Sequence, residues 1–229
     1  MLPNHKQLTQ EFRAESNYAG PLQWIAGLFY FKEDIRIDSI SFNSLAPGNP
    51  LSPFYATQTQ DTKSWAAFGS LNYTVSEKLK LRGGVRYTND KKDFRTITNI
   101  NVTQTGPGTA DADKSKANWD ASLTYKINPD VNAYARVATG FRAPSIAAAS
   151  ASVPITVADA ETITSYEAGI KADLFNRRAR ANFSVYNYEV KNQQLTVVGG
   201  LSNANQLINA AKTKGRGVEA DFEAFITPD

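Results

Sequence analysis

Hydrophobic and polar residues alternate along much of the chain, so that every second side chain falls on the same face of an extended backbone. In the run SWAAFGSLNYTV, the side chains of Trp65, Leu71 and Tyr73 share one face. Those of Ser70 and Asn72 lie on the other face. The runs LKLRGGVRYT and KANWDASLTYKI repeat this alternation. Because long stripes of period 3.6 are missing and Tyr, Phe, Asn and Thr are frequent, the pattern predicts an all-β chain.

The alternating runs predict an antiparallel meander of about nine strands, separated by turn-forming residues. The strands are expected at residues 8–16, 24–35, 63–75, 79–94, 116–127, 131–143, 161–174, 179–196 and 209–226. Short turns are expected at 17–23, 76–78, 128–130 and 176–178, and long polar links at 36–62, 95–115, 144–160 and 197–209. Since short and long connections alternate strictly, all short turns fall on one rim of the sheet and all long links on the other.

This segregation of loop lengths is typical of an outer-membrane barrel, which has short periplasmic turns, long extracellular loops and strands with apolar-out, polar-in alternation. The expected strands are long enough to cross a bilayer, for which about 9–11 tilted residues suffice. Aromatic residues near strand ends fit the girdles at the two membrane interfaces. These residues are Trp24, Tyr73, Tyr87, Tyr125, Tyr134 and Tyr166. The alternative is a soluble β-domain in which the same aromatic residues form a core or an edge.

Several segments, in order along the chain, resemble the barrel of the TonB-dependent outer-membrane receptors. They are QEFRAESNYAGPLQWIAGLFYFKED, AAFGSLNYTVSEKLKLRGGVRYTNDKKDF, YARVATGFRAPS, ETITSYEAGIKADLFNRRARANFSVYNYEVKNQQL and NAAKTKGRGVEADFEA. The resemblance implies that residues 1–229 are a partial barrel domain of this family. Members form a closed transmembrane β-barrel of about 22 strands around an N-terminal plug. A sheet of about nine strands is therefore expected to be open.

The resemblance also implies a function, namely energy-coupled uptake of a bulky, scarce nutrient such as siderophore-bound iron, cobalamin or an oligosaccharide. The implied location is the bacterial outer membrane, and the implied partners are its lipid, the nutrient and the inner-membrane TonB complex. The segment that contacts TonB, the plug, a signal peptide and a final strand ending in an aromatic residue are not recognisable in the sequence, so we expect the chain to be a fragment. The alternative function is a soluble β-rich module that binds carbohydrate or another ligand.

Two stretches of this resemblance carry structural expectations. The run GFRAPS follows a strand, and Pro144 has no N–H to donate to a ladder, so strand pairing should end there and the Ala/Ser-rich run after it should be loop. In KTKGRGVEADFEA, Gly215 and Gly217 are expected to allow a bend or a close approach of other backbone to the wall, or to be simple bulge glycines.

Composition removes several other functions. The chain has no Cys and a single histidine, His5, so thiolate or His-based metal sites are not expected. Its net charge is only +3, with Lys and Arg dispersed among Asp and Glu, which does not favour nucleic acid as a partner. No apolar run is long enough for a transmembrane helix.

No catalytic, cofactor-binding or metal-binding residue is assigned, no cofactor is expected, and the chain is not expected to be an enzyme. The run DADKSKANWDAS begins like a calcium loop at Asp111 and Asp113, but Lys116 stands where the loop needs Gly and Ser122 where it needs Glu. Acidic residues at alternate positions are expected to line a wet lumen. They are Glu11, Glu15, Glu167, Glu219, Asp221 and Glu223. The loops are expected to hold residues that touch substrate, with Phe54, Tyr55, Arg142 and Asn205 as unassigned examples.

Overall fold

The computed structural model describes residues 4–42, 53–100, 103–148, 155–199 and 204–225, and every regular element in them is a β-strand. The strands are β1 (Asn4–Glu15), β2 (Leu22–Phe42), β3 (Pro53–Thr74), β4 (Leu79–Ile100), β5 (Thr103–Asn128), β6 (Val131–Arg142), β7 (Ser145–Ala147), β8 (Thr156–Ala158), β9 (Glu161–Leu174), β10 (Ala179–Gly199) and β11 (Ala204–Ala224). The described residues contain no helix that would cross a membrane.

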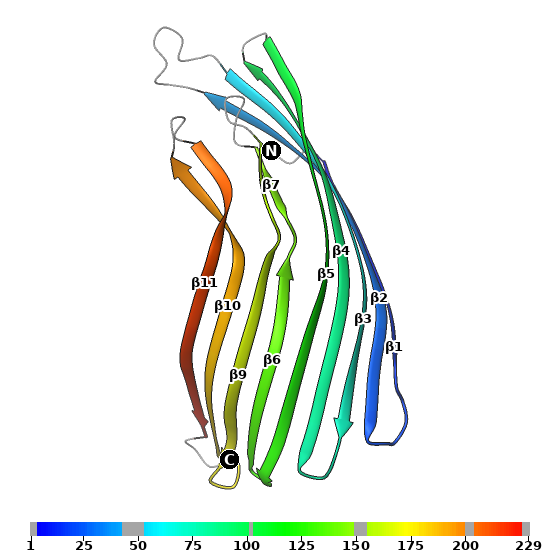
Figure 1. Cartoon of the computed structure of the whole chain (residues 1–229), viewed down its shortest axis with the longest axis vertical. Coiled ribbons are helices and arrows are strands. Elements are labelled where there is room, and N and C mark those ends of the chain that lie inside the picture. The colour runs from blue at the N-terminus through cyan, green and yellow to red at the C-terminus, as the bar shows by residue number, and fades with distance from the viewer. Residues whose placement is uncertain (1–3, 43–52, 101–102, 149–154, 200–203, 226–229) are drawn as a thin grey trace.

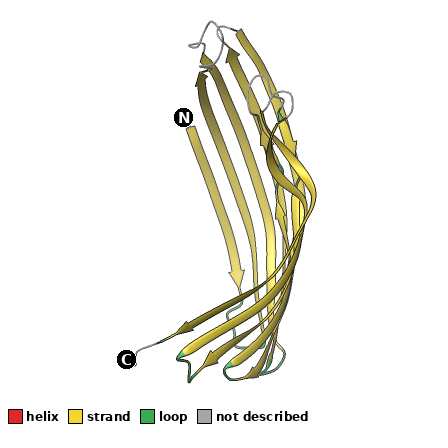
Figure 2. Ribbon diagram, turned by 90° about the vertical axis from the view of Figure 1, so that its left-hand side faces the viewer, coloured by secondary structure: helices red, strands yellow, loops and turns green. Residues whose placement is uncertain are grey.

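Nine of the strands form one open antiparallel sheet in the order β1-β2-β3-β4-β5-β6-β9-β10-β11 (Figure 1). Each strand pairs with its neighbour in the chain, except that the small β7–β8 hairpin is inserted between β6 and β9. Seen from the side, the sheet is curved, not flat (Figure 2). The expected fold class, an open all-β antiparallel meander of about nine strands, is confirmed.

The short turns gather at one rim, the lower one in Figure 1, as the sequence predicts. Local chemistry explains their tightness. The side-chain hydroxyl of Ser76 accepts a hydrogen bond from the backbone N–H of Leu79 at 3.1 Å, and Asn128 Oδ1 accepts one from Asp130 N–H at 3.0 Å. Turns of this kind reverse the chain within a few residues.

The long polar links are shorter than predicted, because the strands extend far into them. Strand β2 continues to Phe42 and β3 already begins at Pro53, while β4 reaches Ile100 and β5 starts at Thr103. Threonine-rich segments such as TQTQDT and TITNI favour strand conformation and pair across neighbours, even where neither face is apolar. Phe54, Tyr55 and Asn205 therefore lie in strands, and Arg142 is the last residue of β6.

The β7–β8 hairpin identifies the concave side of the sheet. The hairpin and the residues beside it form hydrogen bonds with Gln58 on β3, Lys92 on β4 and Gln194 on β10. A hairpin touches strands this far apart in the sheet only from the side toward which the sheet bends. Side chains on the same face as Gln58 and Lys92 therefore point into the concavity.

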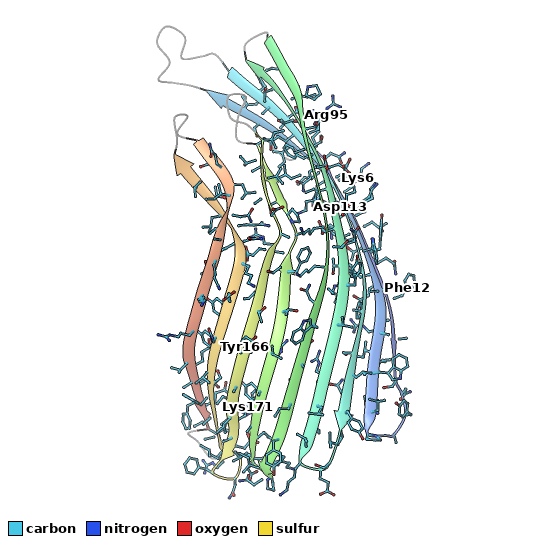
Figure 3. The ribbon with its side chains drawn as sticks, in the orientation of Figure 1. Lys6, Phe12, Arg95, Asp113, Tyr166 and Lys171 are labelled. Atoms are coloured by element: carbon cyan, nitrogen blue, oxygen red, sulfur yellow. The ribbon has the colours of Figure 1, made fainter. Side chains whose placement is uncertain are left out.

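The apolar side chains point the other way. The pairing register places Phe12, Leu28, Ala67 and Tyr87 side by side across four strands. Phe12 is 68% exposed and Leu28 60% exposed, and Phe12 projects away from β1 (Figure 3). On the same side, an apolar hollow of about 760 Å³ includes Leu123, Val137, Tyr166 and Val185 in its lining. An exposed apolar surface of this extent marks contact with lipid or another apolar partner.

Five of the six girdle aromatics lie on this convex face, but Tyr134 does not. Its ring lies over Gly169 on the concave side, and its hydroxyl donates a hydrogen bond to Glu167 Oε1 at 2.5 Å. The prediction for Tyr134 was wrong because the outward residues of β6 are mostly small: Ala133 and Ala135 give little contrast with their neighbours. Tyr30, Trp65 and Tyr87 form the belt nearest the long-loop rim, on adjacent strands.

The face assignment predicts opposite outcomes at adjacent positions of β3 in the full-length protein. Leu71→Arg should lower the free energy of unfolding by about 2–4 kcal/mol, because its charge would enter hydrocarbon. Ser70→Arg should have a much smaller effect, because its side chain enters the polar concavity. Urea titration of both variants refolded in lipid vesicles gives the comparison. Equal penalties, or a larger one at Ser70, would contradict the assignment.

Candidate functional site: the concave wall and its hairpin

The run GFRAPS directs the chain from the wall into the concavity. Pairing of β6 with β9 ends at Arg142, and the proline two residues later is buried. The Pro144 carbonyl accepts a hydrogen bond from Lys92 Nζ at 2.7 Å. The prediction that Pro144 ends the pairing is confirmed. The prediction of loop beyond it needs correction, because Ser145–Ala147 forms β7 and pairs with β8, while residues 149–154 lie outside the described residues.

Gln194 anchors the hairpin to β10. Its side chain is 7% exposed; Oε1 accepts a hydrogen bond from Ser145 Oγ at 2.7 Å, and Nε2 donates to the carbonyls of Ala143 and Asp159 at 2.9 and 3.0 Å. Its backbone N–H donates to Glu161 Oε2 at 2.8 Å. One buried amide thus satisfies backbone groups on both sides of the hairpin. Nothing in the sequence around Gln194 indicated this role.

Two further contacts hold the hairpin at its ends. Gln58 Nε2 donates to the carbonyl of Ala148 at 2.9 Å, and the backbone N–H of Leu207 donates to Thr156 Oγ1 at 3.1 Å. The hairpin therefore connects β3 with β10 and β11 from within the concavity. In a closed barrel this position is inside the long-loop mouth, where a ligand would arrive.

Below the hairpin, aromatic rings lie over glycines of the neighbouring strand. Tyr186 faces Gly217 and Tyr188 faces Gly215 in the register, and a Cβ on either glycine would come within 2.5 and 2.3 Å of the facing tyrosine. Gly215 and Gly217 therefore make room for side chains of the wall itself, not for other backbone. The rings of Tyr186 and Tyr188 stack with centroids 6.2 Å apart.

The remaining concave wall is polar and charged, as expected for a wet lumen. The guanidinium of Arg86 lies 5.1 Å from the Phe29 ring centroid and 5.5 Å from that of Phe68. Arg82 Nε is 3.9 Å from Asp120 Oδ2. A cavity of about 590 Å³ near the short-turn rim includes Lys80, Lys126 and Arg136 in its lining. These groups can hydrate a passage and bind polar ligands.

Among the described residues, no group of three or more His, Cys, Asp or Glu is placed to hold a metal ion. Asp111 and Asp113 belong to the regular strand β5, so they do not form the loop that calcium requires. The acidic residues expected in the lumen lie along the concave wall and do not gather into a cluster that could hold a metal ion. Asp221 Oδ1, for example, accepts a hydrogen bond from Asn182 Nδ2 at 2.7 Å.

Above the belt of Tyr30, Trp65 and Tyr87, the convex face carries charges in rows. One row consists of directly opposed aspartates across β2 to β5: Asp34, Asp61, Asp93 and Asp111. The row nearer the belt places Lys32, Lys63 and Lys91 opposite one another and ends at Asp113. In Figure 3, Asp113 lies in this upper part with Lys6 and Arg95. Facing aspartates repel each other. The adjacent lysines offset that repulsion; Lys32 Nζ, for example, is 3.1 Å from Asp34 Oδ2.

A curved antiparallel sheet with an apolar convex face, a polar concave face and short turns on one rim is the wall of a membrane β-barrel. The model of the TonB dependent receptor-like beta-barrel family matches residues 3–226. The chain belongs to this family, so the expected resemblance is confirmed. Because the family is one of receptors, the expectation that the chain is not an enzyme is also confirmed.

Solved structures share the fold at low sequence identity. The ferric yersiniabactin uptake receptor FyuA from Yersinia pestis is 20% identical with a TM-score of 0.81, and the match covers 98% of this chain and 33% of that one. The closed form of the ferric-catecholate import receptor Fiu from K12 E. coli is 18% identical with a TM-score of 0.70, covering 98% and 36%. The copper transporter OprC is 14% identical with a TM-score of 0.71, covering 97% and 35%. The chain spans about a third of the length of these structures.

We predict that Gln194→Ala loosens the hairpin without opening the wall. Loss of the amide leaves the buried carbonyls of Ala143 and Asp159 without this donor. An unsatisfied buried acceptor costs about 1–3 kcal/mol of stability. Amide hydrogen exchange in the full-length protein should therefore accelerate at Thr156–Ala158 but not in the middle of β10. Gln193→Ala, at the adjacent position, is the control, and equal acceleration in both variants would rule out the anchoring role.

Removing one charge from the aspartate row should raise the free energy of unfolding, and this increase should depend on pH. Burial, followed by hydrogen bonding to and repulsion by Asp34, raises the pKa of Asp61. The folded state therefore binds this proton more tightly than the unfolded chain, and stability falls as the pH rises from about 3.9 through the folded pKa. Asp61→Asn should stabilise the full-length protein by roughly 0.2–1 kcal/mol at neutral pH. The gain should vanish below about pH 3.9.

Asp113→Asn is the matched control for this measurement, because Asp113 faces Lys91 and not another carboxylate. Urea titrations at neutral and acidic pH give the comparison. A stabilisation by Asp61→Asn that persists in acid, or an equal one from Asp113→Asn, would exclude repulsion within the row as its cause.

Proposed function

We propose that residues 1–229 are part of the barrel domain of an outer-membrane receptor that takes up a bulky, scarce nutrient with energy supplied through TonB. The observation that supports this most directly is the pairing of a lipid-type convex face with a polar concavity into which the β7–β8 hairpin folds. A wall of this kind separates lipid from a hydrated passage. The implied location is the bacterial outer membrane, where barrels of this family reside.

Siderophore-bound iron is the substrate class we favour. The two ferric-siderophore or ferric-catecholate receptors described above share the fold, and such chelates are large, polar and often anionic. Cationic groups of the concave wall, such as Lys80, Lys126 and Arg136, suit a ligand of this chemistry. Cobalamin and oligosaccharides remain the other members of the proposed class, and the fold does not separate these substrates, since the copper transporter OprC has it as well.

The partners follow from this function. Lipid would contact the convex face, the nutrient would contact the mouth of the concavity, and TonB would contact a segment other than the wall described above. The alternative is a soluble β-rich module that binds carbohydrate or another ligand. The exposed apolar row that includes Phe12 and Leu28 disfavours it, because a soluble sheet would need a second layer to cover this row.

Fractionation and uptake test the proposal together. In cells, the full-length product should pellet with outer membranes, and its deletion should abolish uptake of one ferric siderophore from a panel that also contains cobalamin and oligosaccharides. An uncoupler of the inner-membrane proton gradient should stop uptake while leaving surface binding intact. Recovery of a soluble monomer, or uptake that is unchanged by the deletion for every compound, would overturn it.

A further inference from the structure

Near the short-turn rim, the concave wall carries a group of cations that nearby carboxylates do not neutralise. The cavity of about 590 Å³ described above includes five cationic side chains and a single carboxylate, that of Glu77, in its lining. Lys171, one of the five, lies toward this rim in Figure 3. The cations are Lys78, Lys80, Lys126, Arg136 and Lys171. Five positive charges and one negative charge give the lining a net charge of +4.

Strand pairing brings three lysines of this group together. Lys80 on β4 lies opposite Thr124 on β5, and Lys126 follows Thr124 by two positions on the same face. Lys80 and Lys126 are therefore diagonal neighbours, about 7–8 Å apart. In the row of Lys126, Asn132 on β6 stands between Lys126 and Lys171 on β9. Since neighbouring strands are only about 5 Å apart, the three flexible side chains can converge on one bound anion.

Carboxylates beside the cavity are paired with other cations. Three aspartates lie within two residues of its lining, and each is paired with an arginine that is not part of the lining. The pairs are Arg82–Asp120 at 3.9 Å, Arg177–Asp130 at 3.8 Å and Arg180–Asp173 at 3.3 Å. Within the described residues, Lys80, Lys126 and Lys171 form no ion pair. Their charges are therefore available to another anion.

Tyr134 holds a fourth carboxylate, that of Glu167, away from Arg136. Arg136 and Glu167 face each other in the register, yet in the described part of the chain the two form no ion pair. Instead, Glu167 Oε1 accepts a hydrogen bond from the Tyr134 hydroxyl at 2.5 Å. Lys171 Nζ lies 5.4 Å from the centroid of the same ring, within the range of a cation–π interaction. Tyr134 is thus a positioning residue that leaves Arg136 free and orients Lys171.

We propose that this cavity binds a compact polyanion, through carboxylate or phosphate oxygens, with the three lysines and Arg136 as its charge partners. The inference rests on the proposed function and narrows its substrate class, because a chelate that passes this wall would then carry several negative charges. The lysines supply point charges, and the planar fork of Arg136 fits two oxygens of a carboxylate or phosphate. A neutral chelate of the same size would leave these charges without partners.

The test measures equilibrium binding of radiolabelled citrate and of radiolabelled pyrophosphate to the full-length protein in detergent micelles. The tighter probe distinguishes a carboxylate ligand from a phosphate ligand. Lys80→Gln, Lys126→Gln and Lys171→Gln together should weaken its binding at least about tenfold, because a single hydrogen bond to a charged group already contributes about that much.

Tyr134→Phe tests the positioning role without changing any charge. It frees Glu167 to pair with Arg136, so binding of the probe should weaken roughly two- to fivefold, as expected for a partly exposed ion pair. Adding Glu167→Gln to this variant should restore the affinity, because no carboxylate is then left to pair with Arg136. A merely structural role of the hydroxyl would not be rescued in this way.

The control replaces Lys6, Lys63 and Lys91 by Gln, which removes the same charge from the convex face and should keep the affinity. No binding of either probe, or an equal loss in both triple variants, would overturn the anion site. Destabilisation of the cavity variant toward urea without probe binding would overturn it too, because a carboxylate of the protein itself would then be the occupant. Ferric-siderophore uptake that continues in these cases leaves the proposed function standing, so the two failures are distinguishable.

Discussion

Backbone hydrogen bonding between neighbouring strands is the constraint on which the whole structure depends. In lipid no water is present to satisfy an unpaired N–H or C=O group, and each such group costs several kcal/mol. The ladders that join β1 through β6, then β6 to β9 and on to β11, meet that demand at the level of the apolar band. Strand pairing also decides which face of the sheet each side chain occupies, because successive side chains of a paired strand must point to opposite faces. The outer edges of β1 and β11 are paired only in a closed barrel.

The same alternation divides the chemistry of the wall. Exposed apolar residues such as Phe12 and Leu28 occupy the convex face, while the concave positions are free to carry charge, as at Arg86 and Glu167. Above the belt of Tyr30, Trp65 and Tyr87 the convex face carries charges instead, which suits contact with water, and water relaxes the demand for complete pairing. The wall can then divide between β5 and β6, and the β7–β8 hairpin can leave the sheet and fold inward around Gln194. The features that would meet ligands arise where the membrane no longer constrains the backbone.

The sequence predicts those parts of the fold in which one face of the sheet is apolar and the other is polar. The order of strands, the four short turns and the outward position of Leu71 follow from period-two alternation and turn chemistry. The extensions of β2 to β5 toward the long-loop rim were missed, because these segments have no apolar face that would mark a strand. Tyr134 was placed outward because a single aromatic beside small residues carries no information about its face.

The candidate site was less predictable. The inward turn at Pro144 has a local cause and was foreseen, but the anchoring role of Gln194 depends on carbonyls far away in the sequence. Likewise, Gly215 and Gly217 signalled a close approach, yet only the register identifies Tyr188 and Tyr186 as the groups that approach. Lys116 and Lys191 line the same cavity although a long stretch of chain separates them, so only the fold makes them neighbours.

The central claim, that one face of this sheet meets lipid and the other a hydrated lumen, is tested most directly by spin labelling along β4. Single cysteines at consecutive positions from Leu79 to Tyr87 of the full-length protein, in lipid vesicles, would carry a nitroxide probe, and this chain itself contains no Cys. Collisions with oxygen should be frequent at Leu81, Val85 and Tyr87, and collisions with a water-soluble nickel complex frequent at Arg82 and Arg86. Uniform accessibility along the strand, or the opposite alternation, would contradict the account.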